Sequence, residues 1–595
     1  MYPFSKSSKS KPFFFFVFIG LVGVMVLANC GAKESAEDKK FAALVDDFMD
    51  WYFETSPVSA TNNGAHQYDG DLDDFSTEAI LDRGEALRSF IQELATIDTT
   101  QLSFDNRLDF KILEGELQER LFSLEALKSW EKSPLMYNYL VGGSIYSLIS
   151  RDFAPWEQRL ANALSRLRKI PRLLEQAKAN LKNPPEVFTE TVISQNKGTI
   201  SLIKDDLARA ADNAPSLKDS ILGESEKVIT ALEDYQDFLE KDLLPRSKGD
   251  FRLGENLYKR KLRFTLDTDM QSEEVVRRAE LEFKAVRKEM YETALPLHQE
   301  FFPDHQHKET GEELERIIVR EVLDEIAKDH PQPEELVDVC RGILDDLTQF
   351  VKDKDLIDLT GINPLTVDWE PEFSRGVAIA GLDSPGPLDK NMESYYRVSP
   401  VPEDWTQEQV ESYLREYNSW MLIDLSVHEA MPGHYVQLYF ANQCPSLVRA
   451  IFGSGCFIEG WAMFSEWMVA NQGFKDSDPR LKLMRLKMYL RAVTNSILDA
   501  KLHAGKMTDE QAMKLMVEGA FQEESEARGK LVRAKLTSTQ LSTYFVGFQE
   551  VFSLYQEYKK AKAESFSLKE FNHQLLGHGS PPVKYLREII LEGQM

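Results

Sequence analysis

The sequence predicts a mainly α-helical protein with a short strand-forming region in front of a histidine–glutamate motif. Two long parts of the chain, about residues 41–355 and 403–595, repeat apolar residues at intervals of three and four, which is the spacing of amphipathic helices. Between them, residues 356–402 carry many prolines and glycines and only short apolar stretches, which favours short strands and loops. The chain has 595 residues, of which 43% are hydrophobic, so a large helical core is possible.

The helical pattern begins at Phe41, after a polar segment at residues 30–40 that we interpret as a tether. Residues 56–76 are polar and rich in turn-forming residues, which predicts a loop. Helix then follows helix to about Lys248, with prolines between the runs. Three long amphipathic helices are expected within residues 273–355, and helices resume at Gln407. We therefore expect residues 41–595 to form one large domain.

Residues 1–29 are typical of a bacterial lipoprotein signal peptide. Three lysines precede an apolar run that is shorter than the roughly 20 residues of a membrane-spanning helix. The run ends in Leu-Ala-Asn-Cys, which resembles a lipobox, so we expect Cys30 to carry the lipid; the alternative is a plain N-terminal membrane anchor. This predicts a protein of the bacterial cell envelope that is anchored to the lipid bilayer only at its N-terminus, at the outer membrane, in the periplasm or on the outer surface.

The charge argues against a nucleic-acid-binding protein, and the cysteine content argues against a disulfide-stabilised scaffold. Loss of the signal peptide removes three lysines and no acidic residue, which changes the formal net charge from −27 to −30. Such a surface repels nucleic acid, so no DNA or RNA partner is expected. Beyond Cys30 only Cys340, Cys444 and Cys456 remain, too few for a disulfide scaffold. We expect them to be buried free thiols, with a Cys444–Cys456 disulfide as the alternative.

The stretch HEAMPGH, which begins at His428, and the downstream Glu459 carry the groups of a hydrolytic zinc site. Zinc binds imidazole nitrogens and a carboxylate oxygen and leaves one position for water. A second carboxylate beside a ligand can take a proton from that water. We therefore assign His428, His434 and Glu459 as ligands of one Zn²⁺ ion and Glu429 as the general base. A helix-capping cluster of polar residues is the alternative.

The spacing of the two histidines differs from the common H-E-x-x-H pattern, because Pro432 occupies the second histidine position and His434 comes two residues later. On an unbroken helix, residues six apart point about 240° away from each other. Pro432 cannot donate a helical hydrogen bond, and Gly433 can adopt unusual dihedral angles. We therefore predict that Pro432 and Gly433 interrupt the helix and bring His434 beside His428.

Two other acidic residues are candidates for supporting roles at this site. Glu466 lies seven residues after Glu459, on the same face of the expected helix, and is either an alternative ligand or a partner of a ligand. Asp424 lies four residues before His428 and can orient its free ring nitrogen.

These motifs resemble the bacterial family called domain of unknown function 885, and the resemblance covers most of the mature chain. The family motifs H-E-A-x-P-G-H, E-G-W-A-x-Y and P-x-x-A-T-x-x-G-x-H-x-Y-D correspond to HEAMPGH, EGWAMF and PVSATNNGAHQYD. Near the C-terminus, RAKLTSTQLSTY and GHGSPPVKYLRE correspond to R-Y-x-x-x-P-G-Q-A-x-S-Y and to a glycine-serine-leucine-proline turn. The family is grouped with zincin peptidases whose third ligand is glutamate, so the resemblance implies a zincin-like fold and a zinc metallopeptidase.

The resemblance also suggests how a peptide substrate is cleaved. Glu429 would move the proton of the attacking water, and Tyr544 is our candidate for a second donor to the oxyanion, with an ordinary core or rim tyrosine as the alternative. Arg533 is a candidate for binding a substrate carboxylate, with a structural ion pair as the alternative. Other candidates for the substrate cleft are Gln540, His573 and His578, although the two histidines can equally be exposed polar residues of a loop. Two different functions remain open: a non-catalytic binding lipoprotein that is tethered to the surface, and a zinc hydrolase of a non-peptide amide or ester.

Overall fold

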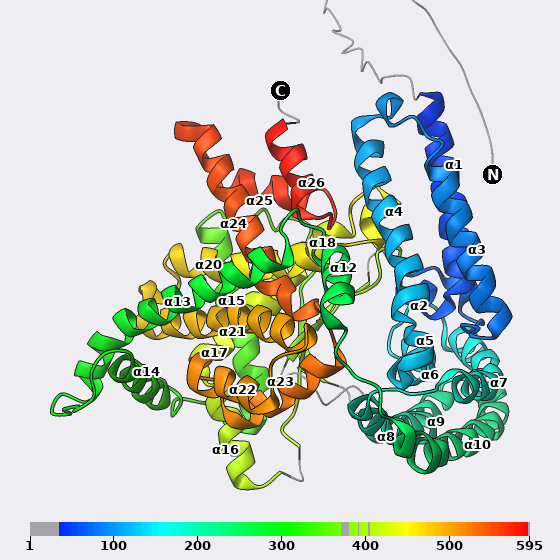
Figure 1. Ribbon diagram of the computed structural model, residues 1–595, viewed down its shortest axis with the longest axis horizontal. Coiled ribbons are helices and arrows are strands. Elements are labelled where there is room, and N and C mark those ends of the chain that lie inside the picture. Colours follow the sequence, from blue (N-terminus) through cyan, green and yellow to red (C-terminus); the bar gives the residue numbers. More distant parts are fainter. Residues whose placement is uncertain (1–34, 371–379, 391, 403–404, 593–595) are drawn as a thin grey trace, which may run out of the picture.

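The structure is a computed structural model that describes residues 35–370, 380–390, 392–402 and 405–592. This part of the chain is almost entirely helical with one small sheet, which confirms the predicted fold class (Figure 1). The signal peptide and Cys30 lie outside the described residues. Among the helices that are described, none is long and apolar enough to cross a membrane. Cys340, Cys444 and Cys456 are buried free thiols, as expected.

The first helix begins earlier than the sequence pattern indicated. It starts at Ala36 rather than at Phe41, so the second half of the expected tether is helical. The reason is a capping box: Ser35 Oγ accepts a hydrogen bond from the Asp38 N–H, and the Asp38 carboxylate accepts one from the Ser35 N–H, at 2.9 and 3.1 Å. The expected loop at residues 56–76 is also wrong in part, because Pro57 starts the short helix α2.

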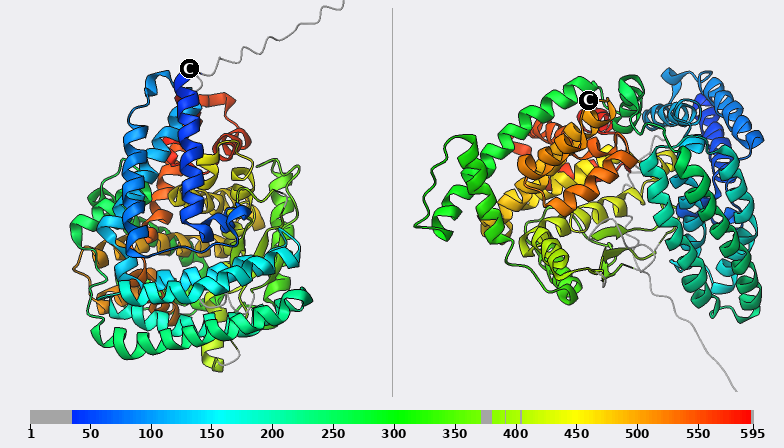
Figure 2. Two further views of the ribbon diagram at one scale, coloured as in Figure 1. Left: turned by 90° about the vertical axis from the view of Figure 1, so that its right-hand side faces the viewer. Right: turned by 60° about the horizontal axis from the view of Figure 1, so that its bottom comes forward.

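The N-terminal helices form their own lobe with two apolar cores (Figure 1, right-hand side). Helices α1, α3 and α4 stand upright in the left panel of Figure 2, and the long helices α7 and α10 lie side by side below them. The helices of this lobe are α1 (Ala36–Thr55), α2 (Pro57–Asn62), α3 (Thr77–Leu94), α4 (Phe104–Phe122), α5 (Ser129–Lys132), α6 (Pro134–Ile149), α7 (Trp156–Asn180), α8 (Glu186–Ser201), α9 (Leu207–Ala211), α10 (Pro215–Phe238) and α11 (Leu244–Arg246).

Most of the remaining helices pack around one large apolar core, and α22 and α23 form a smaller core with the end of α21. The expected helices within residues 273–355 are present, and helices resume at Gln407 as predicted. The helices are α12 (Gly254–Leu266), α13 (Ser272–Phe301), α14 (Glu312–Ile326), α15 (Leu336–Asp353), α16 (Gln407–Glu416), α17 (Ser419–Glu429), α18 (His434–Ala441), α19 (Leu447–Ile451), α20 (Gly455–Asn471), α21 (Pro479–His503), α22 (Asp509–Lys514), α23 (Glu524–Leu536), α24 (Thr543–Lys562), α25 (Leu568–Leu576) and α26 (Val583–Arg587).

The strand region forms a three-stranded sheet of β1 (Thr366–Trp369), β2 (Ala380–Asp383) and β3 (Tyr395–Val398) in the order β1-β3-β2. β3 pairs with β1 in parallel and with β2 in antiparallel orientation. The central residue Tyr396 is completely buried, and its hydroxyl lies 3.2 Å from Ser426 Oγ on α17. The sheet therefore supports the helix that carries His428.

The helices α20 and α24 cross at two glycines. A Cβ atom on Gly460 would lie 2.5 Å from the Gly547 carbonyl carbon, and one on Gly547 would lie 2.0 Å from the Cys456 carbonyl oxygen. Only glycine allows the two backbones to approach so closely. This crossing places Glu459 of α20 near Tyr544 of α24.

The motif PVSATNNGAHQYD ties the N-terminal lobe to the segment before β3. His66 lies between two carboxylates, with Nε2 2.8 Å from Asp389 Oδ1 and Nδ1 3.0 Å from Asp69 Oδ2, and its ring stacks on Phe153 at 3.8 Å. Burial lowers the pKa of His66, but hydrogen bonds and charge from Asp389 and Asp69 outweigh burial and raise this pKa to about 9.

Because of this raised pKa, His66 should contribute to the free energy of unfolding by an amount, or term, that depends on pH. The folded protein binds the His66 proton more tightly than the unfolded chain, so the term is fully present below pH 6.5 and is lost as the pH rises through 9. We expect His66→Gln to lower the free energy of unfolding by on the order of 2 kcal/mol at pH 6. Urea unfolding of both proteins at pH 6 and pH 9.5 measures the difference, and an equal difference at both pH values would contradict the assignment.

Candidate metal centre

His428 and His434 are brought together by an interruption between two helices. Asn418 caps α17, with Oδ1 accepting hydrogen bonds from the N–H groups of Trp420 and Met421 at 3.2 Å each. α17 ends at Glu429, and α18 begins at His434. The two imidazole rings are perpendicular, with centroids 4.7 Å apart. The two histidines are neighbours, as the sequence predicted, although the helix ends three residues before Pro432.

The turn between α17 and α18 requires glycine at position 433. The Gly433 N–H donates to the Val427 carbonyl at 2.9 Å, which folds the turn back onto α17. A Cβ atom on Gly433 would lie 1.9 Å from the His428 carbonyl oxygen and 2.4 Å from that of Val427. Trp461 of α20 holds the other side, because its Nε1–H donates to the Pro432 carbonyl at 2.9 Å. The turn is thus fixed by α17 and α20, the helices that carry His428 and Glu459.

Glu459 completes the group from the first turns of α20. Its Oε2 atom lies 3.4 Å from His428 Nε2 and 3.5 Å from His434 Nε2. Tetrahedral zinc ligands at bond lengths of about 2.1 Å lie roughly 3.4 Å apart, so these spacings fit one ion. Glu459 Oε2 is buried and has no hydrogen-bond partner among the described residues, which leaves its lone pairs for such an ion. The three side chains fit a zinc ion without rearrangement of the helices.

The electrostatics of this group favour a positive charge between the three side chains. Burial raises the pKa of Glu459, but His428 and His434 outweigh burial and hold it well below its usual range. Burial lowers the pKa of His428, but Glu459 and Glu466 outweigh burial and raise it well above its usual value. Both directions mean that the carboxylates of Glu459 and Glu466 favour a positive charge on the imidazole side of the group.

The outer partner of His428 is Glu466, one of the two roles that the sequence left open for this residue. Its Oε1 atom lies 2.7 Å from His428 Nδ1, so Nε2 of the ring faces Glu459 and His434. Glu466 therefore has the role that we expected for Asp424, which is to orient the His428 ring through its second nitrogen. Asp424 is buried one turn earlier on α17, and burial together with the Glu466 charge raises its pKa well above the usual value. Spacing along the sequence could not show which of these two carboxylates contacts His428, because Glu466 comes from a different helix, α20.

A cavity of about 1370 Å³ opens beside the group, between α8 of the N-terminal lobe and the C-terminal helices. His428, Glu429 and Tyr544 line it, together with Ala380 of β2 and the segment 399–402 after β3. Glu429 is partly exposed, so its carboxylate is accessible to a molecule in the cavity. The cavity thus combines a candidate metal site, a partly exposed glutamate and the end of a sheet.

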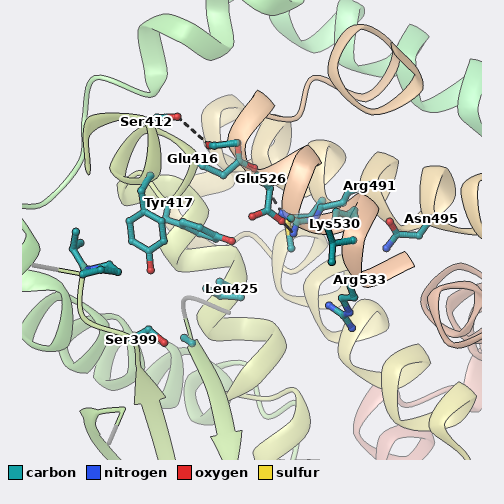
Figure 3. Close-up of a pocket in the computed structure, with 18 of the residues that line it drawn as sticks. Ser399, Ser412, Glu416, Tyr417, Leu425, Arg491, Asn495, Glu526, Lys530 and Arg533 are labelled. Atoms are coloured by element: carbon teal, nitrogen blue, oxygen red, sulfur yellow. Dashed lines mark hydrogen bonds and ion pairs between the residues drawn. The ribbon is translucent and has the colours of Figure 1, made fainter. Parts of the chain in front are cut away.

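Sequence reasoning missed the charged wall of this cavity, which Figure 3 shows. Arg491 of α21 forms ion pairs with Glu416 and Glu526, which come from α16 and α23. Lys530 is buried on the same wall, where burial and the Arg491 charge lower its pKa well below its usual value. These residues lie on three helices and follow the ordinary polar spacing of each, so no sequence motif marks them.

Three residues of the RAKLTSTQLSTY segment lie together at the cavity. Arg533 Nη2 donates to Gln540 Oε1 at 3.2 Å and to the Tyr544 hydroxyl at 3.4 Å, and Gln540 Nε2 donates to the same hydroxyl at 3.4 Å. The Tyr544 ring faces His428 with centroids 6.3 Å apart. Burial and the Glu459 charge raise the pKa of Tyr544, so its hydroxyl keeps its proton.

His573 and His578 are not among the residues that line the cavity. His573 Nε2 accepts a hydrogen bond from the Asp358 N–H at 2.9 Å, and the ring packs against Phe440. The glycine turn after His578 packs behind the site instead, where Ser580 Oγ accepts a hydrogen bond from Gln437 Nε2 at 2.7 Å. Our expectation that these histidines line the cleft is therefore corrected: their segment supports α18 from its other side.

Solved structures with the same fold are of bacterial proteins. One is described as a candidate lipoprotein of unknown function from Shewanella oneidensis; it is 31% identical, with a TM-score of 0.78, and the match covers 94% of this chain and 100% of that one. Another is a candidate lipoprotein from Colwellia psychrerythraea, 18% identical with a TM-score of 0.76 over 94% and 99% of the two chains, which shows the fold alone. No curated protein matches the chain. The model of one family, described as bacterial protein of unknown function (DUF885), matches residues 57–590, and the chain belongs to that family.

Proposed function

We propose that this protein is a zinc-dependent hydrolase that cleaves peptides. The observation that carries the proposal is the convergence of His428, His434 and Glu459 at zinc-ligand spacing, with Glu429 facing the same cavity. A helix-capping cluster is a poorer account of the geometry. Among the described residues the helix that begins at His434 has no side-chain cap, and Glu459 points to two imidazoles instead of to backbone N–H groups.

His428, His434 and Glu459 would hold the ion, which supplies a Lewis acid for the substrate carbonyl and for a water molecule. Glu429 follows a ligand directly in the chain, takes the proton of the attacking water and returns it to the leaving amine. The Tyr544 hydroxyl keeps its proton and donates to the developing oxyanion, while Arg533 and Gln540 hold that hydroxyl in place. Glu466 fixes the orientation of the His428 ring.

The cavity has features that suit a peptide. Its volume of about 1370 Å³ exceeds that of ordinary small-molecule sites. Within the described part of the chain, no carboxylate lies at ion-pair distance from Arg533, which leaves its guanidinium for a substrate carboxylate. Ala380 of β2, an outer strand of the described sheet, lines the cavity, so β2 can offer backbone groups to an extended chain.

The protein acts at the cell envelope in this proposal, held by a lipid on Cys30. The lipobox-like sequence supports the anchor, and the two solved structures named above are described as candidate lipoproteins. A basic surface is not needed for membrane attachment, which agrees with the formal net charge of −27.

The metal content of purified protein tests the ligand assignment directly. We expect His434→Ala to lose one equivalent of zinc relative to the wild type, since zinc that keeps only two of three protein ligands binds far more weakly. His573→Ala is the matched control, because this histidine lies outside the cavity, and it should retain the wild-type zinc content. Equal zinc in His434→Ala and wild type would exclude His434 as a ligand.

The choice between enzyme and binding lipoprotein needs a turnover measurement. Zinc-loaded wild type is incubated with a mixed peptide library, and the products are identified by mass spectrometry. Cleavage that a chelator abolishes supports the peptidase. Intact peptides, with hydrolysis of amide or ester compounds that are not peptides, would assign the same chemistry to another substrate class.

A further inference from the structure

A second group of histidine and glutamate side chains lies far along the chain from the HEAMPGH motif. His298 is in the last turn of α13, His305 and His307 are in the following loop, and Glu321 is on α14. The two helices form a hairpin, and its connecting loop lies at the left edge of Figure 1. The spacing H-x6-H-x-H does not indicate a metal site in the sequence, because the first histidine is one of many polar residues on an amphipathic helix.

We infer that His298, His305, His307 and Glu321 form a second binding site for a divalent transition-metal ion such as zinc. The inference is independent of the hydrolase proposal. The Glu321 Oε2 atom lies 2.7 Å from His298 Nε2, 3.3 Å from His307 Nε2 and 3.5 Å from His305 Nδ1. His298 Nε2 and His307 Nε2 are 3.3 Å apart. Three of these four spacings lie close to the roughly 3.4 Å that separates tetrahedral zinc ligands, and the Glu321–His298 pair is at hydrogen-bond distance.

The hydrogen bonds within this group depend on which ring nitrogens carry protons. Two ring nitrogens that face each other at 3.3 Å cannot both carry a proton, so one of them presents its lone pair to the other. Glu321 Oε2 is at the same time the nearest carboxylate oxygen of all three rings. A metal cation among the four groups can replace these hydrogen bonds, since each ring nitrogen then directs a lone pair toward the ion and the carboxylate supplies a negative charge. Imidazole nitrogens with one carboxylate are ligands that zinc, copper and nickel accept.

The ligand set is that of a structural site and not of a second catalytic centre. Four protein ligands close a tetrahedral zinc ion, whereas catalytic zinc keeps a position for water. The first ligand is deeply buried and the others become more exposed toward the loop. Side-chain exposure is 6% for His298, 11% for His307, 28% for Glu321 and 43% for His305.

The bound ion would fasten the loop at residues 302–311 to both helices of the hairpin. The described backbone of this loop contains no helix or strand, so its main chain has few regular hydrogen bonds to hold it. Two of the four ligands come from the loop and one from each helix. Metal binding therefore links three segments and should protect the loop, in which Lys308 is an exposed trypsin site.

The test uses zinc as the probe and full-length protein without an affinity tag. We expect His305→Ala/His307→Ala to bind one zinc equivalent fewer than the wild type, and Glu321→Gln to bind zinc at this site at least about 100-fold more weakly. His330→Ala is the matched control. His330 lies outside this group and faces Glu411, so the variant should bind as much zinc as the wild type does. The difference of one equivalent does not depend on the HEAMPGH site, which His434→Ala reports separately.

Trypsin cleavage after Lys308 gives a second measurement. Zinc should slow this cleavage at least about tenfold in the wild type and leave it unchanged in His305→Ala/His307→Ala. Circular dichroism of that variant checks that the helices are intact, and Glu321→Gln repeats the comparison with both loop histidines in place. Equal zinc content of the double variant and the wild type, or equal zinc protection of Lys308 in both, would overturn the inference.

Discussion

Replacement of Glu429 by glutamine is expected to lower kcat by about 10³-fold while the protein keeps its zinc. General acid–base catalysis contributes about 10²- to 10⁴-fold, and glutamine cannot accept the proton of the attacking water. The change adds almost no volume, and Glu429 is partly exposed at the cavity, so the fold should be unaffected. Steady-state kinetics on a peptide that the wild type cleaves, together with zinc analysis of the same samples, measures both quantities.

The control for this variant is Glu408→Gln on α16, which removes an exposed carboxylate outside the cavity and should leave kcat unchanged. Two results would argue against the assigned role. Full activity in Glu429→Gln would show that another group moves the proton. Loss of zinc together with activity would show that Glu429 helps to hold the ion.

Gly433→Ala is expected to have the largest effect on the structure of the site. The added Cβ atom would lie 1.9 Å from the His428 carbonyl oxygen, so the turn between α17 and α18 must open. The obstructing atoms are backbone, which cannot move without shifting His428 or His434. We expect a loss of about 3 kcal/mol in the free energy of unfolding and loss of zinc from the HEAMPGH site.

Urea unfolding and zinc analysis measure these effects. Gly223→Ala is the matched control: Gly223 lies inside α10, where nothing is within 4 Å of an added Cβ atom. Alanine favours a helix there, so the control should gain up to about 1 kcal/mol. Wild-type stability and zinc content in Gly433→Ala would show that the turn tolerates a side chain and does not depend on this glycine.

Local patterns in the sequence were enough to predict the helices and a first set of candidate site residues. The apolar spacing predicted helices α13 to α16 closely, because amphipathic helices bury one stripe of side chains wherever they pack. The pattern failed at Ser35 and at Pro57, where caps of a few residues start helices without an apolar repeat. At the motif, Pro432 and Gly433 indicated that the late histidine belongs beside the first.

The tertiary structure decided which side chains meet across separate helices. The choice of Glu466 over Asp424 as the partner of His428 follows from how α20 packs against α17, and no spacing within one helix contains that information. The same reason hid the charged wall around Arg491 and the second histidine group, whose members come from three segments each. The sequence by itself determined the helical class and the candidate ligands, because those depend on neighbours along the chain. The cavity and the second candidate metal site depend on long-range packing, so only the folded molecule shows them.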